Sequence, residues 1–115
     1  MLETDRGIDW IVSAFKEFQK FPDFAKRKIL VALTIAAQGA TADIAKPMKG
    51  LGEGVFEISL KYRTDAYRTV YAVRIDSKIW VVHAFKKKSK KGIKTPKQDI
   101  DLIRNRIKLL KGMLK

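Results

Sequence analysis

The residues best suited to chemistry in this chain are basic, and they gather in its C-terminal half. Segment 86–97, KKKSKKGIKTPK, holds seven lysines and no acidic residue. Phosphate is the natural ligand of such a run, because each lysine that contacts a phosphate releases counterions. Lys61, Arg63 and Arg68 precede the run in stretches with strand character, so one sheet can bring them close to it. The alternative is a solvated basic loop without a role in catalysis.

These residue types suit the cleavage of RNA without a metal. The ribose 2′-hydroxyl can attack its own phosphate if it is aligned, a base takes its proton, an acid protonates the leaving oxygen and cations stabilise the phosphorane. We expect Arg68 and Lys61 to bind and stabilise the phosphate. His83, the single histidine, or Lys86 is expected to move the protons. A buried, hydrogen-bonded core residue is the alternative interpretation of His83.

Further contacts with RNA are expected from the basic run and from the strand before it. An aromatic ring at the end of a strand can stack on an unpaired base, although core packing is its alternative use. We expect RNA to be contacted by Arg63, Phe85, Lys87, Lys88, Lys90 and Lys91.

Charge and composition narrow the classes of function. The chain has 25 Lys and Arg against 12 Asp and Glu, a net charge of +13 and a pI near 10.1, which favours a polyanionic partner. The absence of cysteine and the single histidine exclude disulfides, zinc fingers and thiol catalysis, and we expect no metal or cofactor. The 115 residues predict one domain, 1–115. No secretory stretch and no membrane span are apparent, so we expect a cytoplasmic protein.

Three predicted strands position the basic residues. In 56–62, apolar and polar residues alternate. Segment 66–75 lies between turn signals at 63–65 and 76–78 and is rich in strand-forming residues. One side of that strand carries Arg68, Val70, Ala72 and Arg74, and the other carries Tyr67, Thr69, Tyr71, Val73 and Ile75. Segment 79–87 is apolar on both faces as far as His83, which predicts a central strand but leaves the side of the sheet that His83 faces undetermined.

Helical patterns flank this sheet. A short strand is predicted at 8–12, then a helix at 14–21 with Ser13 as N-cap, then a second helix with Pro22 in its first turn. The glycine-rich stretch 40–54 predicts a connecting loop. A last helix is expected to start with Thr95 as N-cap and Pro96 as its first residue.

Several segments occur in an order and spacing that resemble a known family. They are AKPMKGLG (45–52), GVFE (54–57), AYRTVY (66–71), HAFKKKSKKG (83–92), Thr95-Pro96 and DIDLI (99–103). Together they resemble the phage-related, HigB-like branch of the RelE/ParE toxin superfamily, from Trp10 to about Leu110.

The resemblance implies an α+β fold in which N-terminal helices pack on a small, mostly antiparallel sheet, with a C-terminal helix. It also implies a type II toxin that cleaves mRNA, commonly on the ribosome, and is silenced by a helix-turn-helix antitoxin. By position, Arg68 matches the arginine of the family's Tyr-Arg strand and Lys61 the basic residue of the strand before it. Lys86 or Lys87 matches the basic pair after the last strand.

One departure from the resemblance and two rival functions remain open. Ribosome-dependent RelE enzymes often carry a tyrosine after the basic pair, where this chain continues with Ser89, Lys90 and Lys91, so His83 or a lysine must be considered for proton transfer. A non-catalytic nucleic-acid-binding module needs only the basic surface. A gyrase-inhibiting ParE-like toxin fits the superfamily but leaves the lysine run unexplained. We expect an antitoxin to cover either the basic face or the C-terminal helix.

Overall fold

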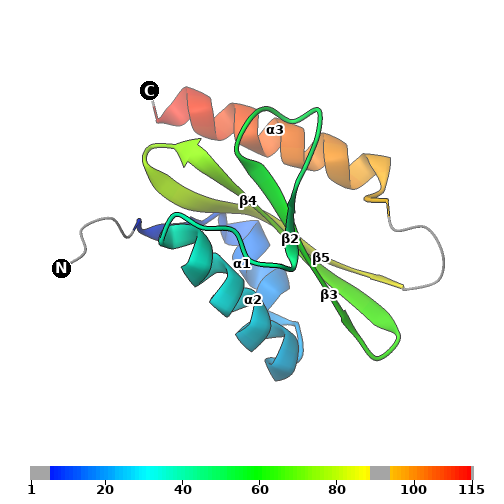
Figure 1. Ribbon diagram of the computed structural model, residues 1–115. Coiled ribbons are helices and arrows are strands. Elements are labelled where there is room, and N and C mark those ends of the chain that lie inside the picture. The colour runs from blue at the N-terminus through cyan, green and yellow to red at the C-terminus, as the bar shows by residue number, and fades with distance from the viewer. Residues whose placement is uncertain (1–5, 89–93, 115) are drawn as a thin grey trace.

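A five-stranded sheet with helices on both faces forms the protein (Figure 1). The computed structural model describes residues 6–88 and 94–114. In chain order the elements are β1 (Ile8–Trp10), α1 (Val12–Gln19), α2 (Asp23–Ala37), β2 (Ala45–Pro47), β3 (Val55–Tyr62), β4 (Asp65–Ile75), β5 (Lys78–Lys88) and α3 (Lys97–Met113). The strand order is β1-β5-β4-β3-β2, and only the β1–β5 pair is parallel. The predicted α+β class, with a mostly antiparallel sheet and a C-terminal helix, is confirmed.

Two tight turns build the central three strands into a meander. The β3–β4 turn contains Arg63 at φ 60°, and the β4–β5 turn contains Asp76 and Ser77 at φ 53° and 54°. Left-handed residues match the right-handed twist of the flanking strands, which fixes the register of each hairpin. The register in turn decides which side chains lie beside one another on the sheet.

The sheet has a separate apolar core on each face. Ile58, Tyr67 and Tyr71 pack with α1 and α2, whereas Val70 and Ala72 pack with residues of α3. Figure 1 shows α1 and α2 together on one side of the sheet and α3 on the other. β4 is therefore buried on both faces along most of its length. A polar side chain on the α3 face of β4 must be satisfied by neighbouring strands or by α3.

The predicted loop 40–54 is wrong at Ala45–Pro47, which forms the edge strand β2. Ala45, Lys46 and Pro47 pair with Ile58, Glu57 and Phe56 of β3. Three residues carry no periodicity by which a strand can be recognised in a sequence. Their strand conformation depends on hydrogen bonds to a segment that follows later in the chain.

The predicted helix starts also need correction. α1 begins at Val12 with Ile11 as its N-cap, so Ser13 lies inside the helix. Pro22 and Pro96 are the N-cap residues of α2 and α3, and α3 starts at Lys97. The hydroxyl of Thr95 donates a hydrogen bond to Glu57 of β3 instead of capping α3. A tertiary contact thus replaces the expected local cap.

Candidate functional site

The antiparallel register aligns side chains of different strands in rows on the α3 face of the sheet. Cross-strand partners share a face, so each row can be followed through the pairing. The rows are Lys46–Glu57–Val70–His83, then Ser59–Arg68–Phe85, then Lys61–Ala66–Lys87. This face therefore carries five of the residues expected to act on RNA, namely Lys61, Arg68, His83, Phe85 and Lys87.

The guanidinium of Arg68 is buried, but its hydrogen bonds are long and incomplete. The residue is 5% exposed, and its Nη1 lies 3.3 Å from Glu57 Oε1 and 3.5 Å from Thr95 Oγ1. Thr95 Oγ1 donates a shorter hydrogen bond, 2.7 Å, to the other carboxylate oxygen of Glu57. The Nε of Arg68 is buried and makes no hydrogen bond. A buried donor without an acceptor is costly, so this arginine retains the capacity to bind an anion.

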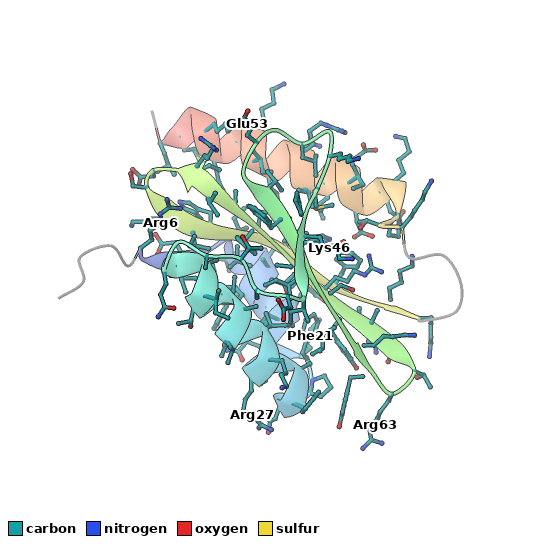
Figure 2. All side chains as sticks on the ribbon, viewed as in Figure 1. Arg6, Phe21, Arg27, Lys46, Glu53 and Arg63 are labelled. Atoms are coloured by element: carbon teal, nitrogen blue, oxygen red, sulfur yellow. The ribbon has the colours of Figure 1, made fainter. Side chains whose placement is uncertain are left out.

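A cavity of about 330 Å³ lies next to Arg68 and is lined by Ile44, Lys46, Glu57, Ser59 and Arg68. Lys46, on β2 (Figure 2), is the direct cross-strand partner of Glu57. Within the described residues the exposed Lys46 side chain makes no ion pair and no hydrogen bond. The cavity therefore combines one unpaired cation, one buried arginine and a single carboxylate.

His83 has both ring nitrogens engaged. Nε2 lies 2.7 Å from Asp99 Oδ1, in the first turn of α3, and Nδ1 lies 3.4 Å from Arg106 Nη1. Because an arginine can only donate, Nδ1 is the acceptor, and the geometry fits the tautomer whose proton is on Nε2 and is donated to Asp99. Arg106 Nη1 also donates to the carbonyl oxygen of Val82, at 2.8 Å, and burial lowers the pKa of Arg106. His83 thus anchors α3 to β5.

Strand alternation separates Lys86 and Lys88 from these rows. Lys86 pairs with Tyr67, whose side chain belongs to the core under α1 and α2, so the two lysines lie on the face opposite to Arg68. Their Nζ atoms lie 4.0 Å and 3.9 Å from the carboxylate of Asp65. The expected grouping of Lys86 with Arg68 and His83 does not occur in the structure.

The remaining expected residues lie at the margins of the site. Arg63 is in the exposed β3–β4 turn, with its guanidinium 5.2 Å from the centre of the Tyr62 ring. Phe85 stacks on His83 at 5.0 Å between ring centres. Lys87 Nζ donates to the carbonyl oxygen of Lys94 at 2.5 Å. Lys90 and Lys91 lie outside the described residues.

Sequence reasoning did not identify Lys46, Glu57, Thr95, Asp99 or Arg106 as site residues. Glu57 had a signal, because it occupies a polar position in an alternating strand, next to Arg68 once the hairpin is closed. Asp99 and Arg106 had only the helical pattern of their segment, which says nothing of a contact with His83.

Residues 6–88 and 94–114 contain neither a metal-binding cluster nor a helix that could cross a membrane. No group of three or more His, Asp or Glu side chains there is arranged to hold a metal ion. None of the helices is both long and apolar enough to cross a membrane.

Comparison with solved structures identifies the fold. An arginine double mutant of the Escherichia coli toxin RelE in the free state superposes with a TM-score of 0.65 at 20% identity, covering 90% of this chain and 98% of that one. The isolated E. coli RelE toxin gives a TM-score of 0.56 at 20% identity, covering 87% of this chain and 97% of that one. The expected RelE-like fold is confirmed.

Comparison of sequences identifies the family. None of the curated proteins searched matches this chain. Residues 16–108 match the family described as "Phage derived protein Gp49-like (DUF891)". This range runs from α1 into α3 and includes every residue that lines the cavity beside Arg68. The chain therefore belongs to the phage-derived Gp49-like family.

Proposed function

We propose that this protein is the toxin of a type II toxin–antitoxin pair and an mRNA endoribonuclease that inhibits translation. The Gp49-like family, the RelE fold and the net charge of +13 support this proposal. The observation that carries it is the buried, incompletely bonded guanidinium of Arg68 at the edge of a cavity. A nucleic-acid phosphate supplies the oxygens that such a guanidinium lacks.

Arg68 binds the scissile phosphate and, with Lys61, stabilises the phosphorane. Glu57 takes the proton of the ribose 2′-hydroxyl, because its carboxylate borders the same cavity and is 3.3 Å from Arg68. The 2′-oxygen then bonds to phosphorus while the bond to the 5′-oxygen breaks. The leaving 5′-oxygen receives its proton from Lys61 or Lys87 on the same sheet face. The products are a 2′,3′-cyclic phosphate and a 5′-hydroxyl, and no metal takes part.

His83 and Lys86 have smaller parts in this scheme. His83 orients α3 and presents Phe85, which stacks on an unpaired base. Lys86 and Lys88, on the opposite face, join Arg63, Lys87, Lys90 and Lys91 in attracting RNA or ribosomal RNA.

The partners follow from the same proposal. The substrate is mRNA in the cytoplasm, on the translating ribosome, and the inhibitor is a helix-turn-helix antitoxin, as in the HigB-like branch. Lys87 and Lys88 lie on opposite faces of the sheet at the basic end of β5. If the antitoxin covers this basic end, charge reversal at both lysines weakens the toxin–antitoxin complex. An unchanged affinity assigns the antitoxin to another surface, such as α3.

A non-catalytic RNA-binding module is the second candidate, and the geometry of His83 favours it. Both ring nitrogens are engaged by Asp99 and Arg106, so the chain's single histidine has no nitrogen available for proton transfer. This candidate predicts salt-dependent binding of RNA without any cleavage product.

The decisive experiment maps mRNA 5′ ends after brief expression of the wild-type protein and of Arg68→Ala. New ends that follow the codon frame and disappear in a folded Arg68→Ala variant support a ribosome-linked ribonuclease. Intact messages during growth arrest contradict the ribonuclease. Binding to RNA without new ends then supports the second candidate.

A further inference from the structure

The cavity beside Arg68 contains a charge arrangement that a bound phosphate would disturb. Glu57 is the only carboxylate among the described residues that line the cavity, and it already forms an ion pair with Arg68. The two side chains are 14% and 7% exposed, so solvent compensates neither charge well. A phosphate that binds Arg68 must compete with Glu57 and then lies next to it as a second negative charge.

Lys46 is positioned to resolve this conflict. It is the cross-strand partner of Glu57, it lines the same cavity, and it has no ion pair or hydrogen bond among the described residues. Directly opposite residues of an antiparallel pair have Cβ atoms about 5 Å apart, within reach of a lysine and a glutamate. The ammonium group of Lys46 can therefore form an ion pair with the Glu57 carboxylate when Arg68 no longer pairs with it.

We propose that Lys46 is a positioning residue that exchanges partners with Arg68. Without RNA, Glu57 is paired with Arg68. With RNA, Arg68 pairs with a backbone phosphate of the RNA and Glu57 pairs with Lys46. Because the anion is taken to be an RNA phosphate, the exchange rests on the proposed ribonuclease function. The cavity, at about 330 Å³, is in the size range of small-ligand sites and accommodates the phosphate with part of its nucleotide.

The exchange differs from simple attraction between Lys46 and the RNA. If Lys46 contacts the phosphate directly, its removal weakens binding by the same factor whether or not Glu57 is charged. If Lys46 forms an ion pair with Glu57, removing the lysine weakens RNA binding only when residue 57 carries a negative charge. A double-mutant cycle between the two residues separates these cases.

The test measures binding of a short single-stranded RNA whose 2′-hydroxyls are all methylated, so that it cannot be cleaved. Fluorescence anisotropy at fixed salt is recorded for the wild type, Lys46→Ala, Glu57→Gln and the double variant. Lys49→Ala is the matched control, because Lys49 is also exposed and nearby in sequence but does not line the cavity. Thermal melting of each variant checks that it is folded.

We expect Lys46→Ala to weaken binding about tenfold, against about twofold for Lys49→Ala, because only the former leaves Glu57 unpaired beside a phosphate. Glu57→Gln should tighten RNA binding. In a protein that carries Glu57→Gln, adding Lys46→Ala should weaken RNA binding by no more than Lys49→Ala does. Lys46→Arg should restore binding, because arginine can also pair with the carboxylate.

If Lys46→Ala weakens RNA binding by the same factor in the wild type and in Glu57→Gln, the exchange of partners is overturned. The ribonuclease proposal is then unaffected. Failure of the wild-type protein to bind the methylated RNA, together with intact mRNA in the 5′-end experiment, overturns the proposed function itself. The two failures are therefore distinguishable.

Discussion

The anchoring of α3 by His83 makes a quantitative prediction for Asp99→Ala. Asp99 Oδ1 is 2.7 Å from His83 Nε2, and the two side chains are 19% and 8% exposed. Removing one partner of a largely buried hydrogen bond costs about 1–3 kcal/mol, because the other partner loses its solvation without compensation. Asp99 also lies in the first turn of α3, where its charge adds about 0.3–1 kcal/mol through the helix dipole. We therefore expect the free energy of unfolding to fall by about 2–3 kcal/mol.

Asp101→Ala is the matched control for this prediction. Asp101 lies on the same helix and forms ion pairs with Lys97 and Arg104, but its side chain is 47% exposed. Exposed pairs contribute about 0–1 kcal/mol. Urea unfolding of both variants gives the two free energies, and hydrogen exchange of the first α3 amides shows whether this end of the helix loosens.

A loss from Asp99→Ala that stays within about 0.5 kcal/mol of the control would refute the anchor. Unchanged protection of the α3 amides would do the same, because the prediction requires the start of α3 to detach from β5 more often. Either result would mean that the apolar core between α3 and the sheet, around Ile103 and Ile107, holds the helix without help from His83.

Three further results are expected. Burial raises the pKa of Tyr71 to about 12, so ultraviolet titration should show one tyrosine that ionises near pH 12. Because this folded-state pKa exceeds the ordinary value of 10, the contribution of Tyr71 to the free energy of unfolding should be constant below pH 10 and should fall by about 2–3 kcal/mol as the pH rises through 12. In urea unfolding, Gly54→Ala should lower the free energy of unfolding by about 1–3 kcal/mol more than Gly52→Ala. Both glycines have positive φ, but of the two only Gly54 would place a Cβ 2.9 Å from another side chain. Equal decreases in the free energy of unfolding would refute this contact. Lys61→Ala should reduce the rate of mRNA cleavage, measured by primer extension, about tenfold or more. Lys86→Ala, on the opposite face of the sheet, should retain more than about half of the wild-type cleavage rate. The reverse order would contradict the assignment of the site to the α3 face.

Several features were predictable from the sequence because they depend on local patterns. Alternation of apolar and polar residues identified β3, strand-forming residues between two turn signals identified β4, and the apolar run before the lysines identified β5. The order of the motifs indicated the RelE-like fold. The polyanionic partner that the charge indicates stays a prediction. Such features can be recognised in a sequence because the periodicity of apolar side chains and the net charge do not depend on what each segment packs against.

The assembly of the candidate site depends on tertiary contacts that the sequence pattern does not reveal. A register shift between Val70 and Tyr71 sets which residues of β5 face α3, and no local pattern in an apolar strand reveals it. The pairing of β2 with β3 brings Lys46 next to Glu57, and the packing of α3 engages both nitrogens of His83. The amino-acid sequence thus specifies which chemical groups the protein has and the three central strands that carry most of them, but it does not reveal β2, which carries Lys46. The neighbours of these groups were decided by contacts between segments far apart in the chain, whose pairing depends on register and on packing of the whole fold.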